Sequence, residues 1–231
     1  SACGKNMMKE TVDTLGNQKK MNYALRADMT KEEFIKEVTD GLMPPPGYFP
    51  MNVKMNKEGY DSIDKVLEEG TKALDPDTFE TIANETGALM LDVRSAADFA
   101  AAHVPNSIFI GLDGSFAPWV GELIIDVKQP ILLITPEGRE QEAVTRLSRV
   151  GFDHTHGFLK GGIEAWKAAG KEVETVHSVP ATELAEKFDE YKERVFDVRK
   201  ETEYLSEHIE DAENTPLSAL NNHMHQFPQD K

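Results

Sequence analysis

Cysteine is almost missing from this chain of 231 residues, which contains a single one, Cys3. One cysteine cannot form a disulfide within the chain, and an unpaired thiol is typical of proteins in the reducing cytoplasm. Any thiol chemistry of the chain therefore depends on Cys3. Long apolar runs are missing too, since the longest are strand-sized and fall well short of the roughly 20 residues that span a membrane. We therefore expect a cytoplasmic protein with no membrane partner.

Basic residues are in the minority. The chain has 25 Lys and Arg against 41 Asp and Glu, which gives a formal net charge of −16. Nucleic-acid binding through phosphates needs positive charge, so we expect no nucleic-acid partner. The hydrophobic content of 39% and the charged content of 29% are ordinary for a globular protein. The length suits one large domain or two small ones.

The first 60 residues lack the pattern of a compact domain. One helix is predicted over residues 27–42, where Thr30 can cap the N-terminus and Glu33 completes a capping box. The next segment, "MPPPGYFPMNVKMN" over residues 43–56, is rich in proline, which prevents a helix and favours an extended polyproline conformation. We expect this segment, with Pro44–Pro50 at its centre, to form a strap that packs on a surface. The side chains expected to make that contact are Tyr48, Phe49 and Met51.

From about residue 73 onward, apolar strands alternate with helices. The segments "ALMLDV", "SIFIGL" and "PILLI" have the composition of buried strands. Helices are predicted for "DPDTFETIANETG", capped by Asp75, and for "SAADFAAAH", "APWVGELI", "REQEAVTRLSRVG" and "GGIEAWKAAG". This alternation predicts an α/β fold with a mostly parallel central sheet flanked by helices.

An internal repeat links two parts of the chain. The segment "LDVRSAADFAAAHVPNSIFIGL" aligns without a gap with "FDVRKETEYLSEHIEDAENTPL", 105 residues later. The matched pairs are Asp92 with Asp197, Arg94 with Arg199, Phe99 with Tyr204, His103 with His208, and Leu112 with Leu217. The repeat predicts two tandem units of one fold. The second unit is a partial copy, because the position matching Thr135 would be residue 240 and the chain ends at Lys231.

These residues resemble the rhodanese domain. Its usual marks are a D-x-R after the first strand, an H-(I/V)-P segment, a six-residue loop that opens with cysteine, and G-G-x-x-A-W near the end. Here they correspond to Asp92–Arg94, His103–Pro105, the loop that follows Ile134, and Gly161–Trp166. The resemblance covers roughly residues 73–173 and implies a rhodanese-like fold. Residues 178–220 are similar to the first half of a second rhodanese domain.

The beginning of the chain, "SACGKNM" followed by "KETVDTLGNQKKMNYALRADMTKEEFIKEVTDGLMPPPGYFP", has a different resemblance. It is similar to the tail of a metallo-β-lactamase-fold protein of the persulfide dioxygenase and glyoxalase-II-like group, whose members often carry rhodanese domains. The resemblance implies that the chain is a fragment or cleavage product of a longer fusion. It further implies a Zn or Fe ion in the missing N-terminal domain of the parent protein, and no cofactor or metal in this chain.

The loop after the strand at residues 130–134 is the candidate site. Alignment with the rhodanese loop places Thr135 at the cysteine position, and the remaining candidate ligand-binding residues are Pro136, Glu137, Gly138, Arg139 and Glu140. An active loop stabilises a thiolate through backbone N–H groups and a helix N-terminus. A threonine hydroxyl cannot form a persulfide, the proline removes an N–H group, and the two glutamates add negative charge. We therefore expect no catalytic residue, in a loop that is either a preserved turn or a binding site for a ligand or partner.

Other motifs have weaker chemical interpretations. A phosphatase variant of the fold would need cysteine and an arginine six positions later, where this chain has Gln141. The pairs His154 with His156 and His223 with His225 have no cysteine or carboxylate cluster at metal-ligand spacing. Structural roles are expected for Asp92 and Arg94 as an ion pair, for His103 and His208 at a turn, and for Trp166 in the core.

Two functions remain open. The first is a catalytically inactive rhodanese-like module of a metal-dependent hydrolase or sulfur dioxygenase, with the parent's metallo-β-lactamase-fold domain as partner and a thiol or persulfide as a further ligand. Its parts would be the tail and strap at residues 1–60, the rhodanese-like domain at 73–175, and half of a second one at 176–231. The second is a tandem thiosulfate or persulfide sulfurtransferase whose cysteine lies in the missing half. The sheet edge of an incomplete unit would also favour a homodimer.

Overall fold

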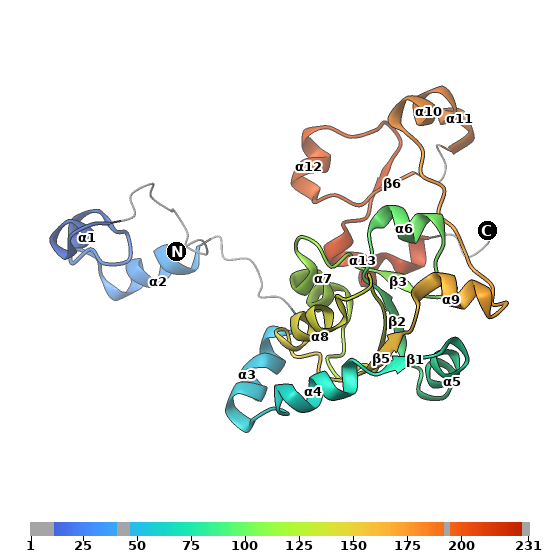
Figure 1. Ribbon diagram of the computed structural model, residues 1–231. Helices are drawn as coiled ribbons and strands as arrows, with labels where there is room; N and C mark the ends of the chain where they lie inside the picture. The colour runs from blue at the N-terminus through green and yellow to red at the C-terminus, as the bar shows by residue number, and fades with distance from the viewer. Residues whose placement is uncertain (1–11, 41–46, 192–194, 228–231) are drawn as a thin grey trace. The chain divides into compact units, whose positions relative to one another are not determined.

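The computed structural model describes residues 12–40, 47–191 and 195–227 (Figure 1). The chain divides into two compact units, Ser1–Pro45 and Pro46–Lys231. In the first unit, helix α1 spans Leu15–Met21 and helix α2 spans Lys31–Thr39. The predicted capping box of α2 is present, because Glu33 N donates to Thr30 Oγ1 at 3.2 Å and Thr30 N donates to the Glu33 carboxylate at 2.8 Å.

The second unit is built on a five-stranded sheet with strand order β1-β5-β4-β2-β3. Its strands are β1 Ala73–Leu74, β2 Leu89–Asp92, β3 Ile108–Phe109, β4 Ile131–Ile134 and β5 Thr155–Leu159. All the paired strands run parallel, which confirms the predicted parallel sheet. Strand β4 lies in the middle of the order, so the residues that follow it lie at the centre of the carboxyl edge.

Helices cover both faces of this sheet (Figure 1). They are α4 Ile63–Gly70, α5 Pro76–Thr86, α6 Ala96–Ala101, α7 Phe116–Leu123, α8 Glu140–Ser148 and α9 Gly162–Ala168. Alternate residues of β4 enter opposite cores: Ile131 and Leu133 pack with side chains of α4, α7 and α8, whereas Leu132 and Ile134 pack with Phe79 of α5 and side chains of α9. Burial on both faces explains why β4 is a continuous apolar run.

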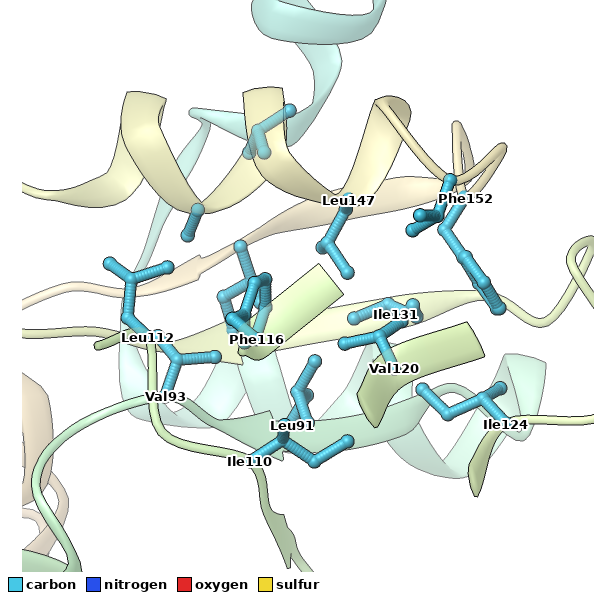
Figure 2. Packing of buried hydrophobic residues seen from close by; sticks show 14 of the residues in the cluster. Leu91, Val93, Ile110, Leu112, Phe116, Val120, Ile124, Ile131, Leu147 and Phe152 are labelled. Atoms are coloured by element: carbon cyan, nitrogen blue, oxygen red, sulfur yellow. The ribbon is translucent and has the colours of Figure 1, made fainter. Parts of the chain in front are cut away.

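Figure 2 shows the first of these cores at close range. Leu91 of β2 and Ile131 of β4 point toward Phe116 of α7 and Leu147 of α8. These four side chains are at most 1% exposed. The core therefore fixes the positions of α7 and α8 over the sheet, and α8 begins at the end of the candidate loop.

The prediction of an extended strap over residues 43–56 is wrong for most of the described part of this segment. Helix α3 spans Phe49–Glu58, and Pro50 lies in its first turn, where a missing N–H group costs no helical hydrogen bond. The prolines at positions 44–46 lie outside the described residues. The expected packing is seen for Tyr48 and Met51, which lie against the core, whereas Phe49 is 46% exposed.

Tyr48 packs directly on Gly121 of helix α7. A Cβ atom added at Gly121 would overlap the ring of Tyr48, whereas one added at Gly47 would meet nothing within 4 Å. We predict that Gly121→Ala lowers the free energy of unfolding by about 1–3 kcal/mol because the ring must move. Urea unfolding with Gly47→Ala as the control measures this. If the Gly121→Ala protein were as stable as the parent, the close packing of Tyr48 on Gly121 would not contribute to the stability of the fold.

The remaining elements follow the five-stranded sheet in the sequence. Strands β6 Phe196–Asp197 and β7 Glu213–Asn214 form a separate two-stranded parallel sheet. The other helices of this part of the chain are α10 Ala181–Glu186, α11 Phe188–Tyr191, α12 Glu201–Ser206, α13 Leu220–His223, and the short 3-10 helices η2 Leu217–Ala219 and η3 Met224–Gln226. Within the described ranges we find no helix with the length and apolar content that a membrane crossing requires.

Candidate functional site

The candidate loop occupies the place that the sequence predicts for it in the fold. Thr135 directly follows β4 and is 7% exposed, and α8 begins at Glu140. Ligand sites of parallel α/β sheets gather at this carboxyl edge. The loop turns at Gly138, which has a φ of 80°, a conformation that glycine adopts without strain. Thr135 therefore lies at the centre of the edge and is buried.

The carboxylate of Glu140 accepts hydrogen bonds from within the loop. Gly138 N donates to Glu140 Oε1 at 3.0 Å, and Thr135 Oγ1 donates to the same oxygen at 3.4 Å. The loop thus directs a backbone N–H group and a hydroxyl toward an anion, and that anion is its own side chain. Glu137, the other acidic residue of the loop, is exposed. The negative charge of Glu140 therefore lies at the hydrogen-bond donors of the loop, whereas that of Glu137 lies at the solvent-exposed surface.

Arg139 forms an ion-pair network at the outer side of the loop. Its guanidinium donates to Glu142 at 2.8 and 3.0 Å and to Asp113 at 2.9 Å. Hydrogen bonds to Glu142 and Asp113 raise the pKa of Arg139, and the arginine in turn holds the pKa of both carboxyl groups below their usual values. Arg139 is therefore already bonded to carboxylates rather than directed at an external anion.

A second arginine ties α8 to the loop before α7. Arg146 donates to the backbone carbonyls of Leu112 and Gly114, and its guanidinium lies 5.4 Å from the ring centroid of Phe116. Sequence reasoning missed Arg146, Asp113 and Glu142. The spacing of Glu142 and Arg146, four apart on a helix, was a signal for their ion pair, but the contacts to a loop more than 25 residues away left no local pattern.

Asp92 and Arg94 form a buried ion pair on the strand next to β4. Asp92 is completely buried, and Arg94 donates to it from the backbone N at 3.0 Å, from Nε at 3.0 and 3.1 Å, and from Nη2 at 2.6 Å. Arg94 Nη2 also donates to the carbonyl of Ala102 at 2.8 Å. The pair therefore joins the end of β2 to the end of α6, in the role that the sequence interpretation gives it.

His103 belongs to the same turn. Its Nδ1 lies 2.9 Å from the carbonyl of Phe99, and its ring stacks on the Phe99 ring with centroids 3.9 Å apart. The backbone of His103 exchanges two hydrogen bonds with Glu174, both of 2.9 Å. These contacts fix the turn from α6 toward β3.

The same contacts recur at the matched positions of the repeat. Arg199 donates to Asp197 from its backbone N at 3.0 Å and from its guanidinium, and Nη2 reaches the carbonyl of Glu207 at 2.8 Å. His208 Nδ1 lies 2.7 Å from the carbonyl of Tyr204, and the two rings stack at 3.8 Å. The hydrogen bonds from Arg199 lower the pKa of Asp197. Here, however, the Arg199 side chain is 47% exposed, against 10% for Arg94.

Several other residues singled out in the sequence lie away from the loop. Trp166 is buried beside Phe79, with ring centroids 6.1 Å apart, and its Nε1 donates to the carbonyl of Glu172 at 2.7 Å. His154 precedes β5 and is exposed. In the described part of the chain no group of three or more His, Cys, Asp and Glu side chains is arranged to hold a metal ion. Cys3 lies outside the described residues.

Comparison with known proteins identifies the middle of the chain. Residues 75–169 match the family described as Rhodanese-like domain. The thiosulfate sulfurtransferase GlpE of Pseudomonas savastanoi is 29% identical over 98 residues, which cover 42% of this chain and 88% of that protein. The thiosulfate sulfurtransferase GlpE of Actinobacillus pleuropneumoniae is 29% identical over 100 residues, which cover 43% and 88%. Residues 75–169 are therefore similar to rhodanese-like domains, as the motifs of this segment predict.

Two solved structures are also similar to parts of this chain. The rhodanese-like domain of an Anabaena protein has a TM-score of 0.38 and 25% identity, covering 47% of this chain and 84% of that one. A metallo-beta-lactamase from Staphylococcus aureus has a TM-score of 0.48 and 24% identity, covering 64% of this chain and 40% of that one.

Proposed function

We propose that the rhodanese-like domain of this chain is a non-catalytic module that holds a partner or ligand and does not transfer sulfur. The proposal depends on two features of the loop between β4 and α8. Thr135 stands where a sulfur nucleophile is needed, and the Glu140 carboxylate accepts the hydrogen bonds of Thr135 and Gly138. A thiolate or persulfide at this place would meet a negative charge instead of free donors.

We further propose that the partner is a metallo-β-lactamase-fold domain in a longer protein, a cytoplasmic metal-dependent hydrolase or persulfide dioxygenase that binds its Zn or Fe outside this chain. The proposal rests on the sequence resemblance of residues 1–60. Helix α3 supports it, because Tyr48 and Met51 anchor α3 on the core of the rhodanese-like unit. We also propose that the rhodanese-like module binds a thiol or persulfide and that the chain associates with a second copy of itself.

A sulfurtransfer assay tests the non-catalytic role. We expect that the chain forms thiocyanate from thiosulfate and cyanide only at the uncatalysed rate, and that Cys3→Ser leaves this rate unchanged. Catalysis that survives Cys3→Ser would place turnover elsewhere and contradict the proposal. Catalysis that disappears with Cys3→Ser would assign it to the N-terminal thiol and leave the rhodanese-like domain non-catalytic. The intact mass and metal content of the natural gene product test the fusion separately.

A second candidate is a tandem sulfurtransferase whose active cysteine belongs to the missing half of the second rhodanese-like copy, the one that begins at residue 176. The recurrence of the Asp92–Arg94 contacts at Asp197–Arg199 favours it, and so do the names of the relatives, which are thiosulfate sulfurtransferases. A longer version of the chain decides between the two candidates. Only the second predicts a cysteine near position 240 and a thiocyanate-forming activity that is lost when this cysteine is replaced by serine.

A further inference from the structure

Strand β6, in the later segment of the internal repeat, has an unpaired edge. Strands β6 and β7 pair with Phe196 opposite Glu213, and β2 and β3 pair with Leu91 opposite Ile108, which are the matched positions 105 residues earlier. The other edge of β2 is covered by β4. Within the described residues β6 has no second strand beside it. The two segments of the repeat therefore differ by one strand.

A groove of about 510 Å³ runs along β6. It is lined by residues 195–199, by residues 207–209 and by Ala212. Its apolar side chains Val198 and Ile209 are each 45% exposed, whereas the matched Val93 and Val104 are each 1% exposed. The groove therefore leaves open to solvent two positions whose counterparts are core residues.

Strand β4 is the element that buries these counterparts. Leu132 and Ile134 of β4 belong to the core cluster of Val104, and Leu133 belongs to the core cluster of Val93. The backbone N of Val93 donates to the carbonyl of Ile134 at 2.9 Å. A parallel apolar strand thus supplies both the side chains and the backbone acceptor that this place in the fold requires.

The backbone of β6 offers the matching donor. Val198 N corresponds to Val93 N and makes no hydrogen bond within the described part of the chain. The carbonyl of Val198 accepts a hydrogen bond of 2.9 Å from Leu217 N, as the carbonyl of Val93 does from Leu112 N at 3.0 Å. The backbone of Val198 is therefore arranged as in a paired strand, with its N–H group left for an added one. Open edges of this kind accept strands from other chains.

The charges around the groove indicate which flanks such a strand should have. The guanidinium of Arg199 is bonded to Asp197, and Glu207 adds a second carboxylate to the lining. Residues 199–213 contain six Asp and Glu against two basic residues, Arg199 and Lys200. A segment that has a basic flank and no acidic residue is therefore complementary to this surface.

We propose that the groove binds an extended apolar segment of another polypeptide, which carries a basic residue at its flank and pairs as a parallel strand with β6. A backbone carbonyl of the segment accepts a hydrogen bond from Val198 N. Its alternate side chains cover Ile209 on one face and Val198 on the other. Apolar burial and main-chain hydrogen bonds together supply the affinity. The site does not depend on whether the loop at Thr135 is catalytic.

A peptide with the sequence of residues 128–136, KQPILLITP, is the probe, because it reproduces β4 with Lys128 as a basic flank and has no acidic residue. The peptide is amidated at its C-terminus and carries a dye at its N-terminus. We expect its fluorescence anisotropy to rise saturably as the 231-residue chain is added. A control peptide with Leu132→Asp and Ile134→Asp should bind at least about tenfold more weakly, since it loses the apolar contacts.

Substitutions in the protein locate the site. Ile209→Asp should weaken binding about tenfold, because a charge replaces apolar contact surface. Leu205→Asp is the matched control: Leu205 is 71% exposed on α12 and does not line the groove, so binding should be unchanged. A nitroxide in place of the dye tests the direction of the strand. It should broaden the amide signal of Glu213, at the start of β7, more than that of Leu217, which lies beyond its end.

Four results would overturn the proposal. They are no saturable binding, equal binding of the control peptide, unchanged binding to Ile209→Asp, and stronger broadening at Leu217 than at Glu213. A dimer of the chain that excludes the peptide and dissociates in Ile209→Asp would also overturn it, because the groove would then hold a second copy. Sedimentation measures this. If circular dichroism shows that Ile209→Asp is unfolded, Ile209→Ser replaces it, and weakening of about tenfold is still required.

Discussion

Thr135→Cys alone will not turn the loop into a sulfur-transfer site. In Thr135→Cys combined with Glu140→Gln, the thiolate will attack the outer sulfur of thiosulfate, form a persulfide and release sulfite. In the single variant the new sulfur would lie beside the Glu140 carboxylate, which now accepts a hydrogen bond from Thr135 at 3.4 Å. A neighbouring negative charge raises the pKa of a thiol, because it disfavours the thiolate. The thiol would therefore be mostly protonated and unreactive at neutral pH.

The second substitution removes that charge and adds an amide NH2 group that can donate to the thiolate. Gly138 N, which donates to Glu140 at 3.0 Å, can keep its hydrogen bond to the amide oxygen of the glutamine. We expect the pKa of the introduced thiol to fall by about one unit between the single and the double variant. The pKa is measured from the pH dependence of alkylation by iodoacetamide, in a Cys3→Ser background so that only the introduced thiol reacts. Persulfide formation is read as the gain of one sulfur atom in the intact mass.

Glu137→Gln provides the matched control, because Glu137 is an exposed carboxylate of the same loop. Combined with Thr135→Cys, it should leave the pKa of the thiol nearly unchanged. An equal pKa shift from either glutamate would mean that net loop charge, and not the contact with Glu140, disfavours the thiolate. Full reactivity of the single Thr135→Cys variant would contradict the view that Glu140 blocks the loop.

The position of this loop could be predicted because its signals are local. The apolar run "PILLI" predicts a central strand with a hydrophobic core on each face. The loop that follows such a strand lies at the carboxyl edge of the sheet. Strand β5 has no such signal. Its sequence THGFL mixes a glycine and a histidine with apolar residues, and it becomes a strand by pairing with β4 on one side and β1 on the other.

Long-range contacts also decide what the sequence could not show about helix α3 and about Glu140. Proline in "GYFPMN" indicates an extended segment unless it falls in the first turn of a helix, and the packing of Tyr48 and Met51 on the core selects the helix. The negative charge of Glu140 near the loop was predicted. That its carboxylate accepts the hydrogen bonds of Thr135 and Gly138 depends on the side-chain direction at the start of α8, which no pattern of residue types specifies.

Arg94→Met should destabilise the protein by about 3–5 kcal/mol, whereas the matched Arg199→Met should have a far smaller effect. The two arginines make the same hydrogen bonds to Asp92 and Asp197, but they differ in burial. Removal of Arg94 would leave Asp92 as an uncompensated charge with no solvent exposure. Asp197 lies under an arginine that is 47% exposed, so water can replace the lost guanidinium.

Urea unfolding of both variants, followed by circular dichroism, measures the two free energies. A cycle with Asp92→Asn separates burial of the charge from loss of the contact. If the unpaired carboxylate is the cause, Asp92→Asn combined with Arg94→Met should recover part of the stability that Arg94→Met loses, because the remaining buried side chain is neutral. Two results would contradict this explanation: equal losses of stability from Arg94→Met and Arg199→Met, or no recovery in the double variant. Either result would show that the difference in burial matters less than the hydrogen bond that each arginine donates to a carbonyl, Arg94 to Ala102 and Arg199 to Glu207.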